Sequence, residues 1–108
     1  MDAYVVDCLT RAGTEVEIPA GRVIVETGQP GLGVFVIQAG TCEVHAPEGT
    51  RKLGAGAVFG GRALHEAHGR RTARVVAKTD VRLVAVDRPT VEALRDDDPD
   101  FAAALPLD

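Results

Sequence analysis

The sequence predicts a small all-β domain folded as a sandwich or barrel, and its strand and turn signals carry this prediction. Several short segments alternate polar and apolar residues, as residues 14–18 do with Thr-Glu-Val-Glu-Ile, which is typical of a half-buried strand. The chain holds 12 Gly and 6 Pro, and short strands with frequent turns are typical of sandwiches and barrels. Because Trp is absent and aromatic residues make up only 4% of the chain, we expect a core of Val, Leu, Ile and Ala.

The expected elements follow one another with short connections. Seven or eight short strands are expected, and the clearest are residues 14–18, 22–26, 33–38, 41–45, 50–53, 72–77 and 81–86. Helices are expected at residues 2–11, 62–67, 89–94 and 98–105. Pro89 and Pro99 support the last two helices, because Pro is favoured at the first helical position. A glycine-rich passage at residues 54–61 precedes the helix formers at 62–67.

The length and charge of the chain limit the number of domains and the classes of function that we expect. A chain of 108 residues has the size of one domain, so residues 1–108 are expected to form a single folded unit. The formal net charge is −4, and an acidic excess repels nucleic-acid backbones, so no nucleic-acid binding is expected from this chain alone. The local exception is the group Arg70, Arg71 and Arg74, and a solvated face is the simpler interpretation of such a run taken alone.

The N-terminus and the two cysteines indicate a cytoplasmic setting. The chain begins Met-Asp-Ala-Tyr, without the basic region and apolar run of a signal peptide, and no apolar stretch reaches the length of a membrane span. Cys8 and Cys42 are therefore expected to be free thiols that pack as small hydrophobes.

The side chains form no catalytic or metal-binding pattern. Ser is absent, and no nucleophile, base and orienting acid form a triad, so we expect a binding domain and not an enzyme. His65 and His68 lack a third ligand, and Cys42 and His45 would point to opposite faces of a strand. The acidic run at residues 96–98 lacks the spaced oxygen ligands of a calcium loop. Neither a metal nor a cofactor is expected.

One segment, residues 59–73, carries the residue types of a phosphate pocket. Gly60 and Gly61 permit close approach of the backbone to a ligand, and they precede an expected helix whose first amides favour an anion. Arg71 can pair with a phosphate in bidentate fashion, and Thr72 beside it adds a hydroxyl donor. Taken alone, such a passage is more simply a turn, and the rest of the chain changes that interpretation.

Glycines and apolar residues recur in a specific order along the whole chain. The segments that show it are residues 18–24 (IPAGRVI), 28–31 (GQPG), 35–40 (FVIQAG), 53–60 (LGAGAVFG), 63–64 (AL) and 71–75 (RTARV). This order resembles the cyclic nucleotide-binding domain family, which includes catabolite activator proteins, regulatory subunits of cyclic-AMP-dependent kinases and cyclic-nucleotide-gated channels. The resemblance covers about residues 15–105 and implies an eight-stranded β-roll, a jelly-roll-like barrel, with short flanking helices.

The resemblance also implies a ligand and its site. Residues 59–73 would form the family's phosphate-binding cassette, in which Arg71 pairs with the cyclic phosphate and Thr72 assists. Backbone amides of residues 60–64 would complete the phosphate site. The ligand-binding residues expected on this basis are Gly60, Gly61, Arg62, Ala63, Leu64, Arg71, Thr72 and Ala73. The expected ligand is cyclic AMP or cyclic GMP, with cyclic AMP favoured.

The chain departs from the family pattern at one contact. The family loop reads Phe-Gly-Glu, and its Glu accepts hydrogen bonds from the ribose 2′-hydroxyl; here Gly61 takes that position, and Arg62 stands where an aliphatic residue is usual. A hydrogen bond to a charged group contributes about 1.5–3 kcal/mol, so its loss weakens binding about ten- to a hundredfold. Two functions therefore stay open: a cyclic-nucleotide sensor, and a domain without nucleotide that serves as an interaction module for a protein partner or effector domain.

Overall fold

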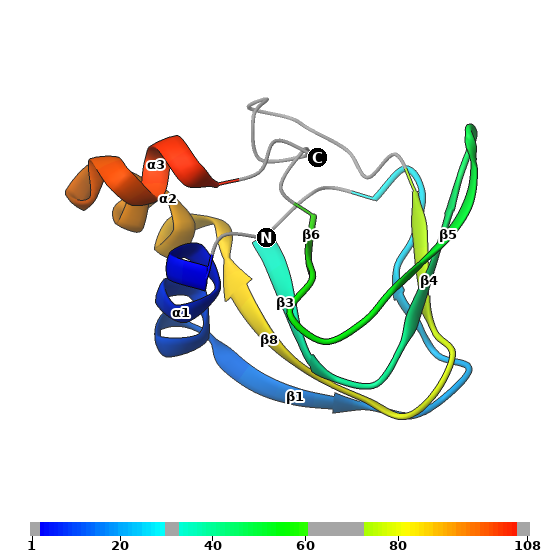
Figure 1. Cartoon of the computed structure of the whole chain (residues 1–108). Coiled ribbons are helices and arrows are strands. Elements are labelled where there is room, and N and C mark those ends of the chain that lie inside the picture. The colour runs from blue at the N-terminus through cyan, green and yellow to red at the C-terminus, as the bar shows by residue number, and fades with distance from the viewer. Residues whose placement is uncertain (1–2, 30–32, 61–72, 106–108) are drawn as a thin grey trace.

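Two antiparallel four-stranded sheets form the body of the fold, with helices at one side (Figure 1). The computed structural model describes residues 3–29, 33–60 and 73–105. The strands are β1 (Thr14–Ile18), β2 (Val23–Val25), β3 (Gly33–Ala39), β4 (Cys42–Ala46), β5 (Gly49–Leu53), β6 (Val58–Phe59), β7 (Arg74–Ala77) and β8 (Val81–Asp87). The first sheet has the order β1-β8-β3-β6 and the second sheet the order β2-β7-β4-β5. This arrangement confirms the mainly β, eight-stranded fold.

Strand β6 is the element that the sequence pattern did not indicate. It consists of Val58 and Phe59 alone and lies at the end of the glycine-rich passage. Two residues are too few to show a period, and the strand forms because they pair with Phe35 and Val36 of β3. The helix expected at residues 62–67 lies outside the described residues, and the helix expected at 89–94 extends further, from Arg88 to Asp97.

Strands β3 and β8 are buried on both faces, which explains their nearly continuous apolar sequences. Successive side chains of a strand point to opposite faces of its sheet. One face contributes to a core shared with the helices through Val34, Val36, Val84 and Val86. The other face contributes to a core between the two sheets through Phe35, Ile37, Val81 and Leu83. The first sheet is therefore the middle layer of the molecule.

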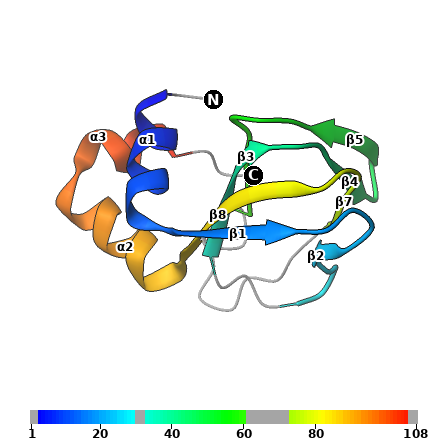
Figure 2. The same cartoon turned by 90° about the horizontal axis from the view of Figure 1, so that it is seen from below.

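The helices cover the outer face of the first sheet. They are α1 (Ala3–Ala12), α2 (Arg88–Asp97) and α3 (Pro99–Ala104), and Figure 2 shows them gathered beside β8. The helical side chains fully buried in this core are Val5, Leu9, Val91 and Phe101. Among the described helices, none is long and apolar enough to cross a membrane.

Asp98 joins the helices at a single point. Its backbone N–H donates to the Leu94 carbonyl at 3.0 Å and ends α2. Its carboxylate accepts from the N–H groups of Asp100 and Phe101, both at 3.1 Å, and so caps the N-terminus of α3. The Tyr4 hydroxyl of α1 donates to the same carboxylate. This hydrogen bond, with those from the two backbone groups, lowers the pKa of Asp98.

The two cysteines lie in different cores. Cys8 packs among the helices, and Cys42 packs between the sheets, where burial raises the pKa of its thiol. Both are free and buried, as the sequence predicted.

Gly40 shapes the turn between β3 and β4. Its φ of +92° lies in the left-handed region, which L side chains rarely adopt. A Cβ at this position would also collide with the Asp80 carbonyl oxygen and lie 2.9 Å from the Thr79 hydroxyl. The turn therefore requires Gly40 both for its backbone conformation and for its close packing against the loop between β7 and β8.

A series of Gly→Ala variants separates these two requirements. Gly54→Ala has open space and no left-handed backbone, so its free energy of unfolding should stay within about 0.5 kcal/mol of the parent. Gly21→Ala has a left-handed backbone in open space and should lose about 1–2 kcal/mol. Gly40→Ala combines both costs and should lose more than about 2 kcal/mol. Urea unfolding measures all three, and equal losses at Gly21 and Gly40 would contradict the packing argument.

The Asp98 junction predicts a specific pH dependence of stability. Because the folded-state pKa is lowered below the ordinary value of 3.8, the stabilisation is complete above pH 3.8 and is lost as the pH falls through the folded pKa. Asp98→Asn should therefore lower the thermal midpoint at pH 7, and its difference from the parent should shrink on acidification. Tyr4→Phe removes one of the three hydrogen bonds and should show a smaller loss with the same trend. A difference that is constant between pH 7 and pH 3 would contradict this role.

Candidate functional site

The predicted cassette is framed by two strands, one from each sheet. The described chain reaches Gly60 just after β6 and continues at Ala73 just before β7. Both points lie at the same end of the two sheets, the upper end in Figure 1, which we call the Gly60 end. The frame of the cassette therefore joins the two sheets at one end of the core between them.

Phe59 fixes the first side of this frame. It pairs with Phe35 across the sheet, and the two rings stack with their centroids 5.0 Å apart and an angle of 21° between their planes. Phe59 is buried among side chains of the opposite sheet, including Val44 and Val75. Gly60 follows with a φ of +97°, a left-handed conformation that favours glycine. The chain thus leaves β6 from a rigid aromatic anchor through a glycine-specific bend.

Ala73 and Arg74 form the second side. Ala73 is half-buried and packs against the core between the sheets. The Arg74 side chain is exposed and its Nε lies 2.9 Å from Oε1 of Glu26, just beyond β2. This hydrogen bond lowers the pKa of Glu26. Arg74 is therefore already neutralised by a partner within the fold.

The described residues include only part of the predicted site. Gly60 and Ala73 lie on the two sides of the frame, as given above. The other predicted ligand-binding residues lie outside the described residues, and their roles stay predictions: Gly61, Arg62, Ala63, Leu64, Arg71 and Thr72.

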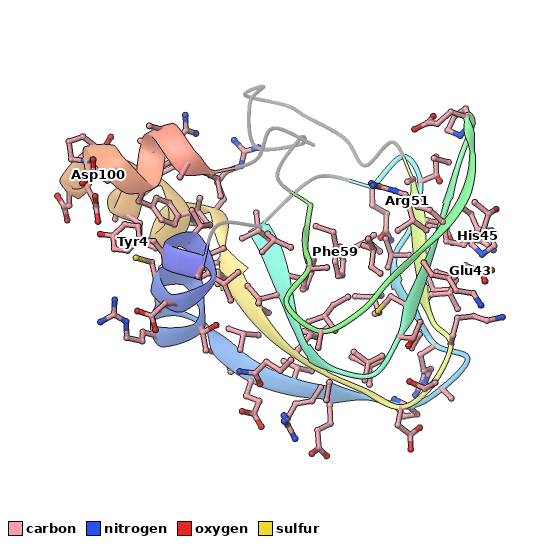
Figure 3. The ribbon with its side chains drawn as sticks, in the orientation of Figure 1. Tyr4, Glu43, His45, Arg51, Phe59 and Asp100 are labelled. Carbon is pink, nitrogen blue, oxygen red and sulfur yellow. The ribbon has the colours of Figure 1, made fainter. Side chains whose placement is uncertain are left out.

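Arg51 is a residue at this end that the sequence analysis did not single out. It pairs with Val44 across β4 and β5, and Val44 pairs with Val75 across β4 and β7. Residues paired across strands share a face, and Val44 and Val75 are buried between the sheets. Figure 3 shows Arg51 on the inner side of β4 and β5, toward Phe59, with His45 and Glu43 on the outer side. The available signal was spacing: Arg51 is two residues before apolar Leu53, and residues two apart on a strand share a face.

The outer face of β4 carries polar contacts of a different kind. His45 Nε2 lies 2.9 Å from Glu43 Oε1, and Lys78 Nζ lies 3.7 Å from Glu43 Oε2. Cys42 is buried and His45 exposed, so they lie on opposite faces as the sequence predicted. Within the described ranges, the structure groups no three His, Cys, Asp or Glu side chains that would hold a metal ion.

A surface hollow of about 510 Å³ lies at the other end of the sheets. Its lining comes from the β1–β2 and β7–β8 turns and the adjoining strand ends: Glu17, Ile18, Pro19, Ala39, Asp80, Val81 and Arg82. None of the predicted ligand-binding residues is among them. Its mixed charges give no match to a single ligand class.

Comparisons with known proteins agree with this architecture. The sequence profile described as "Cyclic nucleotide-binding domain" matches residues 15–98 of this chain. A structure reported under "A cyclic-GMP-dependent signalling pathway regulates bacterial phytopathogenesis" is 30% identical, with a TM-score of 0.86 over 95% of this chain and 85% of that chain.

Two further similar structures are those of a catabolite activator protein and of a domain of a transcriptional regulator. The catabolite activator protein of Thermus thermophilus is 27% identical with a TM-score of 0.79, covering 95% of this chain and 51% of that one. The N-terminal domain of a transcriptional regulator from Streptomyces coelicolor A3(2) is 27% identical with a TM-score of 0.72, covering 97% of this chain and 79% of that one. The present chain spans about half the length of the Thermus protein.

The profile match includes the whole of residues 59–73, and the fold matches these structures over 95% of this chain. The chain belongs to the cyclic nucleotide-binding domain family, a family of regulatory ligand-binding domains.

Proposed function

We propose that residues 1–108 form one regulatory domain that binds a cyclic nucleotide at the Gly60 end and catalyses no reaction. The observation that carries this proposal is the frame of the cassette: Phe59 and Gly60 on one side and Ala73 on the other lie at one end of the core between the sheets. The family match runs continuously through the intervening segment.

The phosphate is held by residues 60–73 in this proposal. Arg71 supplies a bidentate guanidinium, and Thr72 supplies a hydroxyl donor. Backbone N–H groups of residues 60–64 donate to the remaining phosphate oxygens, with Arg62, Ala63 and Leu64 contributing main-chain groups, and Ala73 closes the site against the core. A cluster of donors favours an anion without any metal or cofactor.

The ligand is a purine cyclic nucleotide, either cyclic AMP or cyclic GMP. The two share the phosphate and ribose, so the cassette alone accepts both. Among the relatives, the one with the highest TM-score quoted above is tied by its description to a cyclic-GMP-dependent pathway, and the catabolite activator protein represents the transcriptional regulators of the family.

Binding is transmitted to the helices through β3. Phe35 on one face of β3 stacks on Phe59 beside the cassette, and Val34 and Val36 on the other face pack against the helices. A displacement of Phe59 on binding is therefore passed to the helical core through a single strand, β3. The ligand shifts the position of the helices only to the extent that it binds the two arrangements with different affinity.

The alternative function is a protein-interaction module that has lost its nucleotide. Gly61 at the position of the family's Glu is the observation that favours it, and Arg62 adds a charge where the family is aliphatic. The two functions differ in one measurable property, which is whether the natural sequence binds a cyclic nucleotide.

Calorimetric titration of the parent and two variants with cyclic AMP and cyclic GMP tests the phosphate site. Arg71→Ala should cost about 1.5–3 kcal/mol of binding free energy for both ligands, or about ten- to a hundredfold in Kd, because it removes a charge-assisted bidentate contact. Arg70→Ala removes the same charge one residue away and should change Kd much less. Equal losses for the two variants would show that only net charge matters.

Gly61→Glu tests the ribose contact in the same titration. It restores an acceptor for the 2′-hydroxyl and should tighten binding, by less than the Arg71→Ala loss because Arg62 competes for the new carboxylate. Binding by Gly61→Glu and none by the parent would favour the interaction module for the natural sequence. Tight binding by the parent that is unchanged in Arg71→Ala would rule out this phosphate site.

A further inference from the structure

The edge strands of the two sheets differ in how open they are to a further strand. Among the described strands, the edges of the first sheet are β1 and β6, and those of the second sheet are β2 and β5. An edge strand directs the backbone N–H and C=O groups of every second residue away from its neighbour, where another chain can pair with them. Whether such pairing is favourable depends on the length, the register and the side chains of the edge.

Three of these four edges are poorly suited to an added strand. Strand β6 has only two residues, and β2 has three residues whose register with β7 is shifted. Strand β5 is longer and pairs regularly with β4. Its Thr50 and Lys52 lie on the outer face and Arg51 on the inner face, so both faces are polar. An added strand would gain little length at β2 or β6 and little apolar contact at β5.

Strand β1 combines a regular edge with two chemically different faces. Its five residues, Thr14–Ile18, pair with β8 without a shift of register. No other described strand pairs with β1, and Figure 1 shows it at the outer edge of the sheet beyond β8. Val16 and Ile18 are half-buried and pack against the core between the sheets. Glu15 and Glu17 are exposed on the opposite face, so this edge offers an apolar row and an acidic row.

The acidic row is only partly neutralised within the fold. Glu15 Oε1 lies 3.9 Å from Nε of Arg82, and both side chains are largely exposed, so this ion pair is weak. Glu17 lies opposite Arg82 in the register with β8 but forms no ion pair among the residues that the structure describes. Two carboxylates therefore share one guanidinium, and the outer face of β1 keeps an excess of negative charge.

This charge pattern makes a second copy of the chain a poor occupant of the edge. When two β1 strands pair antiparallel about Val16, Glu15 of one copy lies opposite Glu17 of the other. Like charges directly opposite each other destabilise a strand pair, whereas opposite charges stabilise it. The strand that matches both rows is one in which apolar and basic residues alternate.

We infer that β1 is a docking edge for an extended segment of a protein partner in which apolar and basic residues alternate. The segment adds to the first sheet through backbone hydrogen bonds, which supply affinity for any extended chain. Its apolar side chains lie beside Val16 and Ile18, and its Lys or Arg side chains lie beside Glu15 and Glu17. The inference does not depend on a bound nucleotide and applies to a nucleotide sensor and to an interaction module alike.

The experiment is an NMR titration of the isotope-labelled full chain with a short capped peptide in which Lys and Val alternate, the Lys-Val peptide. The amide resonances of β1 should shift, and hydrogen exchange should slow at alternate residues of Thr14–Ile18 as their N–H groups gain partners. The same peptide with every backbone nitrogen methylated keeps its charge and side chains but has no backbone donors, so it should not bind.

Two variants separate recognition at this edge from attraction by the acidic chain as a whole. Glu17→Gln should weaken binding of the Lys-Val peptide about 1.5- to 5-fold, because it removes one opposite-charge pair. Glu48→Gln removes the same charge from the exposed turn between β4 and β5 and should leave the affinity unchanged. A peptide in which Glu and Val alternate should bind the parent more weakly than the Lys-Val peptide.

The outcomes decide the role of β1 without reference to the nucleotide site. No binding of the Lys-Val peptide, equal binding of its methylated form, or equal losses in Glu17→Gln and Glu48→Gln overturns the docking edge. Shifts confined to other strands overturn it as well. Slowed exchange in β1 together with a loss of affinity in Glu17→Gln alone supports it, and none of these results changes the proposed nucleotide binding.

Discussion

The burial of β3 and β8 on both faces determines the rest of the architecture. The two strands pair along Val34↔Val86 and Val36↔Val84, and their side chains alternate between two apolar surfaces. Apolar area on both sides of a sheet has to be removed from water by separate layers. The helices supply one layer and the second sheet supplies the other, so the position of every remaining element follows from the need to cover this pair.

This central position also connects the cassette to the helices. The side chain of Phe35 packs against the core between the sheets, and those of its chain neighbours Val34 and Val36 pack in the core shared with the helices. Close-packed interiors transmit small displacements because they contain little free volume. The helices are joined in turn at Asp98, which ends α2, caps α3 and accepts from Tyr4 of α1. In the proposed function, a shift at Phe59 is passed to a helical unit whose three helices are joined at Asp98.

Local patterns in the sequence predicted the elements but not the contacts between distant residues. Alternation in residues 14–18 and the apolar run of β3 identified strands because each signal lies within a few neighbouring residues. Strand β6 was not predicted because its two residues form a strand only by pairing with β3. The Glu26–Arg74 ion pair spans 48 positions and the Tyr4–Asp98 hydrogen bond spans 94, and no local pattern encodes either. For the site, the family motif indicated residues 59–73, of which the structure describes Phe59, Gly60 and Ala73.

The two described arginines near the Gly60 end, Arg51 and Arg74, have different electrostatic surroundings. Arg74 is neutralised by Glu26 at 2.9 Å and adds little net field. Arg51 is in register with buried Val44, is exposed to solvent, and has no hydrogen bond or ion pair within the described residues. The acidic run at residues 96–98 lies at the C-terminal end of α2. Of these two arginines, Arg51 and not Arg74 therefore adds positive charge to the Gly60 end.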